Sequence, residues 1–174
     1  ILMTTVCLIV FPAFFFFACD LKNLPAGERL LAAMFQSVTT RTAGFNTIDI
    51  SEMSEASKAV MILLMLIGGS PGSTAGGMKT TTFMVLILNA IATFRSQENA
   101  GAFGRRLEYH VIKNAATIAM LYFTLFFCGG VAISVYEGLP LLDCLYEAAS
   151  AVGTVGLTLG VTPELHVFSQ VVLI

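Results

Sequence analysis

Two short segments of the chain carry the same pattern, a threonine followed two residues later by a glycine. The first Thr-x-Gly segment is Thr42-Ala43-Gly44 and the second is Thr154-Val155-Gly156, and each lies between apolar stretches. The chemistry of such a pattern would come from the main chain, because carbonyl oxygens can replace the water shell of a potassium ion. Glycine lets the backbone turn its carbonyls toward the ion without a steric penalty. We therefore predict that the carbonyls of all six residues bind the ion.

The surroundings of the two segments also correspond, so an ordinary turn explains them poorly. The two glycines are 112 residues apart, and the same offset pairs Leu30 with Leu142 and residues 60–62 with 172–174. We predict a repeat made of a span, a short pore helix, a filter segment and a second span, with both copies in the same orientation. The C-terminal end of each pore helix would carry about −0.5 charge, which favours a nearby cation.

The composition indicates a membrane protein. Of 174 residues, 56% are hydrophobic and only 11% are charged, with a mean hydropathy of +0.85. A water-soluble domain usually carries about 25% charged residues. Both ends of the sequence are apolar, and we expect the chain to be part of a longer protein. The sequence holds no H-E-x-x-H or C-x-x-C motif, and we expect neither an enzyme nor a cofactor, and no metal beyond potassium as the substrate.

The pattern of apolar stretches predicts spans and shorter descending helices. Residues 1–19 and 111–136 are long enough to cross a bilayer of about 30 Å. Residues 28–38 and 140–152 are too short to cross, and a last helix is predicted over 163–174. The expected fold class is all-α integral membrane and potassium-channel-like. The predicted domains are a pore repeat over 1–95, a cytoplasmic linker over 96–110 and a second pore repeat over 111–174.

A nearly uncharged stretch over 57–94 is too long for one span, because a straight helix of that length would measure about 57 Å. Its centre, the glycine-rich loop over 68–80, contains Pro71 and too many glycines for a helix. Irregular backbone at membrane depth is tolerated only against protein or a water-filled cavity. We therefore predict that this loop gates the conduction path. The predicted gate residues are Gly72, Ser73, Thr74, Gly76, Gly77 and Lys79.

Two other interpretations of this loop remain open. It could be a passive break between two helices. It could also bind phosphate, because Gly72 and Gly77 followed by Met78-Lys79-Thr80 nearly match G-x4-G-K-[ST]. The lysine is displaced by one residue, and a membrane helix precedes the loop where that motif requires a strand. Gating is therefore the favoured interpretation.

Three charged residues lie close to these segments. Lys79 would either repel cations in a closed pore or extend to the cytoplasmic edge of the membrane. Arg41 and Glu147 are predicted to support the filter, either by pairing behind it or separately. In the separate case Arg41 donates to nearby carbonyls and Glu147 reaches the outer vestibule.

The distribution of charge predicts the orientation. Arg95, Arg105, Arg106 and Lys113 are opposed by only Glu98 and Glu108, so the linker is expected to be cytoplasmic. The Thr-x-Gly segments then face outward, among acidic residues that attract cations. So few basic residues do not indicate nucleic-acid binding; they favour a topology signal or a docking surface for a cytosolic subunit.

Three motifs together resemble a known family: Thr-Arg-Thr-Ala-Gly-Phe-Asn over 40–46, Gly-Gly-Ser-Pro-Gly-Ser-Thr-Ala-Gly-Gly-Met-Lys-Thr over 68–80, and Gly-Thr-Val-Gly-Leu over 153–157. The chain is similar to the membrane subunit of Ktr-type potassium transporters in the Trk/Ktr/HKT superfamily. It resembles the third and most of the fourth of the family's four repeats. Val152 departs from the family pattern, in which a larger aromatic residue is frequent.

The resemblance implies potassium uptake across the cytoplasmic membrane of a prokaryote, through a filter whose glycines match Gly44 and Gly156. It also implies that loop 68–80 gates the flow, and that the protein works as a homodimer on a cytosolic nucleotide-binding ring. Membrane lipid is the other expected partner. Sodium-permeable or mixed cation transport on the same fold is the alternative, because the first two filters are absent from this sequence. A membrane enzyme lacks support in the sequence, and a nonconducting scaffold would not need two such segments and a broken helix.

Overall fold

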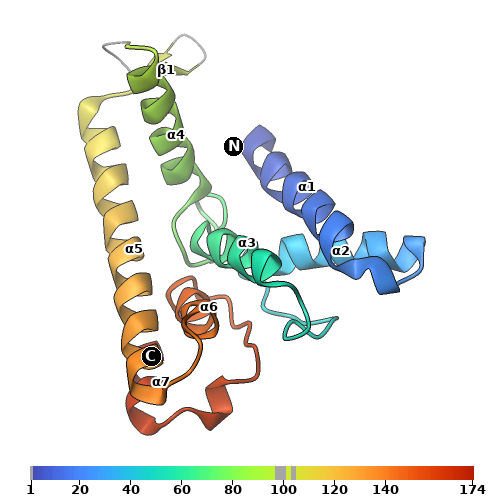
Figure 1. The fold of residues 1–174 in the computed structure, drawn as a ribbon. Helices are drawn as coiled ribbons and strands as arrows, with labels where there is room; N and C mark the ends of the chain where they lie inside the picture. Colours follow the sequence, from blue (N-terminus) through green and yellow to red (C-terminus); the bar gives the residue numbers. More distant parts are fainter. Residues whose placement is uncertain (1, 97–100, 103–104) are drawn as a thin grey trace.

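The computed structural model describes residues 2–96, 101–102 and 105–174 (Figure 1). It is helical apart from a pair of two-residue strands, β1 (Gly101–Ala102) and β2 (Arg105–Arg106), which lie antiparallel. These strands fall in the predicted linker over 96–110, of which residues 97–100 and 103–104 lie outside the described part of the chain.

Two helices are long and apolar enough to cross a membrane: α1 (Leu2–Cys19) and α5 (Tyr109–Glu137). They match the predicted spans, and α5 ends at Gly138, whose φ of 70° is favourable for glycine. In Figure 1, α1 and α5 lie on opposite sides of the molecule, with α3 (Glu55–Leu66), α4 (Thr80–Phe94) and α6 (Leu141–Val152) between them. Most side chains of both helices face outward, as lipid-facing surfaces require. The fold is therefore that of an all-α membrane protein.

Two short helices lie directly before the Thr-x-Gly segments. Helix α2 (Ala26–Thr39) packs against α1, and α6 (Leu141–Val152) packs against α5. At about 1.5 Å per residue they measure about 21 and 18 Å, too short to cross the hydrocarbon layer. Both have one apolar face and one polar face, which fits helices that pack on a span on one side only.

The predicted broken helix is present as α3 (Glu55–Leu66) and α4 (Thr80–Phe94). The oxygen of Ser54 accepts from the Ser57 N–H at 3.3 Å and caps the start of α3. Where α3 ends, the chain is pinned by two backbone bonds: Gly68 N–H donates to the Met78 carbonyl at 2.8 Å and Met78 N–H to the Leu66 carbonyl at 3.0 Å. The glycine-rich loop is therefore closed at its base.

One core cluster joins the two halves of the chain through α3. Its fully buried members include Phe16 of α1, Met61 and Met65 of α3, and Tyr146 and Ala149 of α6. Helix α3 lies against α6 and also contacts α1, as Figure 1 shows at the centre of the molecule. An ion pair adds to this contact, with Lys58 Nζ 3.7 Å from Asp143 Oδ1. The arrangement brings the ends of α2 and α6 to the same region.

The C-terminal segment differs from its prediction. A single helix was expected over 163–174, but a 3₁₀ turn over Thr162–Glu164 precedes a shorter helix, α7 (Val167–Leu173). The carboxylate of Glu137 at the end of α5 accepts from His166 N–H at 2.9 Å and lies 2.7 Å from His166 Nδ1. It also accepts from the Ser169 hydroxyl. These bonds hold His166 at the N-terminal cap of α7, so the helix begins at Val167, four residues after the predicted start at residue 163.

Candidate functional site

The two Thr-x-Gly segments share an uncommon backbone conformation. Thr42 and Gly44 have φ angles of 68° and 74°, and Thr154 and Gly156 have φ angles of 53° and 87°. Threonine rarely adopts a positive φ, because its branched side chain meets the backbone there. Within the described ranges only Ser96 joins the two threonines as a non-glycine residue of this kind. The sequence repeat is thus accompanied by a repeat of backbone shape.

The first segment is held by Thr39, the last residue of α2. The N–H groups of Ala43 and Gly44 both donate to the Thr39 carbonyl, at 3.1 and 3.2 Å. The N–H of Phe45 donates to the Thr39 hydroxyl at 2.9 Å, and that hydroxyl donates to the Phe45 carbonyl at 2.6 Å. Three successive N–H groups are therefore turned toward one residue.

These bonds determine where the carbonyls of the first segment point. In a trans peptide group the N–H and C=O lie in one plane and point in opposite directions. Because the N–H groups of residues 43–45 turn toward Thr39, the carbonyls of Thr42, Ala43 and Gly44 turn away from it. Sequence reasoning missed Thr39, whose side chain is only 1% exposed, because nothing distinguishes it from the neighbouring Thr40.

The second segment is held differently. Val155 N–H donates to the Ser150 carbonyl at 2.8 Å and Thr154 N–H to the Ala151 carbonyl at 2.9 Å. Beyond the segment, the carboxylate of Glu147 binds the returning chain. It accepts from the Thr158 hydroxyl at 2.7 Å, the Leu159 N–H at 2.9 Å and the Thr162 hydroxyl at 2.6 Å.

Glu147 therefore holds the returning chain, and its place at an outer vestibule stays a prediction. Its side chain is 4% exposed and its oxygens are occupied by the chain that follows the second segment. Nor does it pair with Arg41, whose Nη2 donates instead to the Gly68 carbonyl at 3.3 Å. The two predicted support residues act on different parts of the site. The threonines that bind Glu147 were not identified from the sequence, because their spacing matches no known motif.

The backbones of the two Thr-x-Gly segments are in close contact, at Gly44 of the first and Val155 of the second. A Cβ atom at Gly44 would lie 2.2 Å from the carbonyl oxygen of Val155 and 3.8 Å from the Cα of Gly156. No side chain fits in that space, so glycine is required at position 44 for close approach as well as for its φ angle. At Gly156 nothing lies within 4 Å of a Cβ, so only the φ angle requires glycine.

The glycine-rich loop contacts both segments. A Cβ at Gly76 would lie 1.9 Å from Oγ1 of Thr154, so the loop backbone presses against the second segment. The Arg41 bond to Gly68 joins the loop to the residue that precedes the first segment. Gly77 has a φ of 70° and packs against Gly68 at the base of the loop, while residues 72–74 are exposed at its tip.

The ammonium of Lys79 turns back into this loop. Lys79 Nζ donates to the carbonyl of Ser73 at 3.2 Å and to that of Ala75. The side chain therefore holds the tip of the loop to its base, because an ammonium group can donate to several carbonyls at once. Its position relative to the membrane edge stays a prediction.

Comparison with known proteins identifies the family. Residues 1–174, the whole chain, match the TrkH family, described as cation transport protein. The chain belongs to the TrkH family. It is 39% identical to Ktr system potassium uptake protein B of Bacillus subtilis over 154 residues, covering 88% of this chain and 35% of that protein. It is 40% identical to potassium/sodium uptake protein NtpJ of Enterococcus hirae over 151 residues, which cover 84% of this chain and 34% of that protein.

Ktr system potassium uptake protein D of Bacillus subtilis is 35% identical over 162 residues, covering 91% of this chain and 36% of its own length. The TrkH-family chain thus spans about a third of the curated relatives that it matches. These relatives support the Ktr-type resemblance read from the three motifs. They are named as transport proteins, which agrees with the expectation that the chain is not an enzyme.

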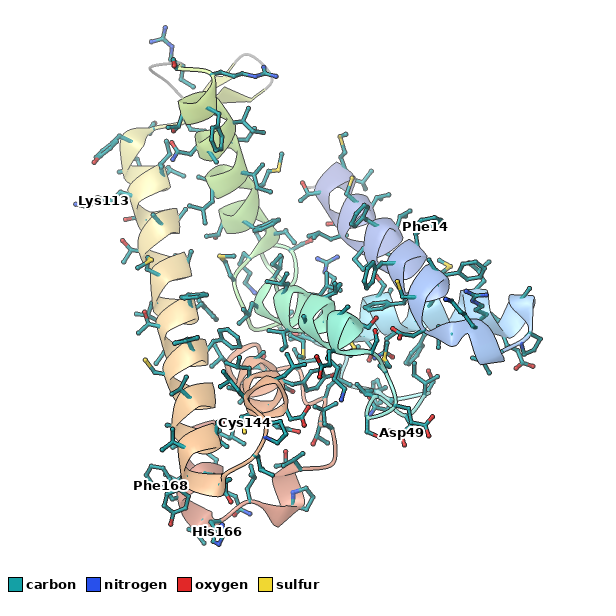
Figure 2. The ribbon with its side chains drawn as sticks, in the orientation of Figure 1. Phe14, Asp49, Lys113, Cys144, His166 and Phe168 are labelled. Carbon is teal, nitrogen blue, oxygen red and sulfur yellow. The ribbon has the colours of Figure 1, made fainter. Side chains whose placement is uncertain are left out.

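The labelled polar side chains of this TrkH-family chain lie toward different ends of the molecule. Figure 2 shows Lys113 at the end of α5 that adjoins β1 and β2, and Asp49 and His166 at the opposite end. Phe14 and Phe168 point outward from their helices, which suits lipid or protein contact.

Proposed function

We propose that this chain supplies two of the walls of a potassium pathway, and that the full-length protein takes up potassium ions across the cytoplasmic membrane of a prokaryote. The observation that carries the proposal is the meeting of Gly44 with Val155, which places two segments of matching backbone shape side by side. The carbonyls of residues 42–44 and 154–156 would replace the water shell of the ion. Potassium is the substrate, and no cofactor takes part.

The repeat architecture supports this proposal. Each Thr-x-Gly segment follows a short helix whose C-terminal end lies beside it, so the partial negative charge at the ends of α2 and α6 favours a cation there. The carboxylate of Glu147 is fully occupied in holding the chain beyond the second segment. We assign 1–95 and 111–174 to two pore repeats, equivalent to the third and fourth of the family, joined by the linker over 96–110.

The glycine-rich loop is the proposed gate. Small residues let it lie close under the second segment, where Gly76 meets Thr154. The bonds of Lys79 to Ser73 and Ala75 hold the loop in this position. Nucleotide binding by this loop has no support, because a helix and not a strand precedes it.

Selectivity and partners follow from the relatives by analogy. A relative is named a potassium/sodium uptake protein, so mixed cation transport on the same fold is the alternative outcome. The names of two others place them in a Ktr system, which supports a regulatory subunit as a partner. We propose a homodimer in membrane lipid that docks on a cytosolic nucleotide-binding ring, with the basic linker facing the ring and the Thr-x-Gly segments facing outward.

Growth rescue tests the proposed function. The full-length protein, expressed in a bacterium that lacks potassium uptake, is expected to restore growth at low external potassium. A variant lacking loop residues 72–74 and a filter variant at Gly156 serve as comparisons. Uptake of sodium as well as potassium by the expressed protein would support the alternative. Absence of rescue by a protein that accumulates in the membrane would contradict potassium uptake.

A further inference from the structure

The two Thr-x-Gly segments differ in what holds the chain immediately after the glycine. After Gly156 comes Leu157, which is 2% exposed and lies in the main core cluster. After Gly44 comes Phe45, whose side chain is 71% exposed. Packing therefore fixes the exit of the second segment, and it does not fix the exit of the first.

The exit of the first segment is instead fixed by a hydroxyl group. In the part of the chain that the structure describes, the backbone of Phe45 hydrogen-bonds with Thr39 alone. The Thr39 Oγ1 lies 2.9 Å from the Phe45 backbone nitrogen and 2.6 Å from the Phe45 carbonyl oxygen. The equivalent of Thr39 at the 112-residue offset is Ala151, which has no hydroxyl. The two repeats thus use different means for the same task.

The hydroxyl of Thr39 acts on the Gly44 carbonyl through the peptide plane. The Phe45 N–H and the Gly44 carbonyl belong to one rigid trans peptide group and point in opposite directions. Binding the N–H therefore aims the Gly44 carbonyl away from α2. Gly44 itself offers no resistance to rotation, because a residue without a Cβ tolerates most backbone angles.

We propose that Thr39 is a positioning residue for ion selection, and that its hydroxyl fixes the Gly44 carbonyl at the mouth of the first segment. The inference rests on the proposed function of the two segments as a potassium filter. Without the hydroxyl, the peptide group between Gly44 and Phe45 rotates, and the carbonyl can approach a smaller ion. Sodium then competes better with potassium, because discrimination depends on the number and placement of the coordinating carbonyls.

Thr40 provides a matched control. It is the next residue, it is also fully buried, and its hydroxyl donates to the Ser37 carbonyl within the same helix at 3.0 Å. Thr39→Val and Thr40→Val therefore remove the same atom from the same kind of environment. Only the first change releases Phe45.

The experiment measures potassium uptake by the full-length protein, with the apparent KM for potassium and the inhibition by sodium determined for each variant. Thr39→Val is expected to lose about tenfold in preference for potassium over sodium, while Thr39→Ser, which keeps the hydroxyl, and Thr40→Val keep the parent preference. If Thr39→Val does not accumulate in the membrane, Thr39→Ala is measured in its place, with the same expectation.

An unchanged preference in an accumulating Thr39→Val or Thr39→Ala protein would overturn the inference, as would an equal loss in Thr40→Val. Gly44→Ser, measured beside them, separates this failure from that of the proposed function. If Gly44→Ser loses preference and Thr39→Val does not, only the role of Thr39 is refuted. If neither variant changes the preference, the proposed filter is refuted with it.

Discussion

Gly44→Ser is expected to remove most of the preference for potassium over sodium, by about 100-fold, in the full-length protein. The substitution meets two obstacles at once. The φ of 74° is costly for any residue with a Cβ, by about 1–2 kcal/mol. The new Cβ would also lie 2.2 Å from the Val155 carbonyl oxygen, so the two Thr-x-Gly segments must separate. Uptake of potassium measured against increasing sodium checks the result.

Gly156→Ser is the internal comparison for this result. Its φ of 87° imposes a similar conformational cost, but nothing lies within 4 Å of its Cβ. A loss of about tenfold is expected, since about 1.4 kcal/mol corresponds to a factor of ten. Gly138→Ser, at the left-handed end of α5 and away from both segments, controls for strain alone and should leave the preference unchanged. If Gly44→Ser and Gly156→Ser both keep the full preference for potassium over sodium, the assignment of the two Thr-x-Gly segments to an ion filter is contradicted.

Removal of residues 72–74 is expected to raise the maximal rate of potassium uptake several-fold and to weaken its control. These residues form the exposed tip of the glycine-rich loop, and their loss removes the Ser73 carbonyl that Lys79 binds. The base remains closed by the bonds of Gly68 and Met78, so the helices on either side are preserved. The shorter loop then reaches less far beneath the second segment.

A length-preserving variant separates the two effects of this deletion. Ser73→Gly combined with Thr74→Gly keeps the length of the loop and the backbone carbonyls that bind Lys79. Its uptake rate should stay close to that of the parent if loop length closes the path. A deletion variant that accumulates normally yet transports at or below the parent rate would refute gating by this loop.

The sequence predicted those features that depend on residue type over a stretch of chain. Apolar length marked α1 and α5, and the density of glycine with Pro71 marked the break between α3 and α4. The correspondence between the two Thr-x-Gly segments could be predicted because similar residues recur at an offset of 112 positions. Whether these segments act as a filter stays a prediction that transport measurements must test.

The features that the sequence did not predict depend on single contacts between distant residues. Arg41 binds Gly68 because the loop folds back to it, and no spacing rule anticipates that contact. The start of α7 is set by Glu137, 29 residues before His166. The choice between Thr39 and Thr40 depends on which side of the helix end faces the returning chain. Such contacts follow from the tertiary arrangement and leave no periodic signal.

Crystals of the full-length protein soaked in thallium provide the most direct test, because Tl⁺ replaces potassium and scatters anomalously. Anomalous peaks are expected on a line between the carbonyls of residues 42–44 and 154–156, at distances that fit direct coordination. Anomalous density confined to surface carboxylates such as Asp49, with none between the two Thr-x-Gly segments, would contradict the account.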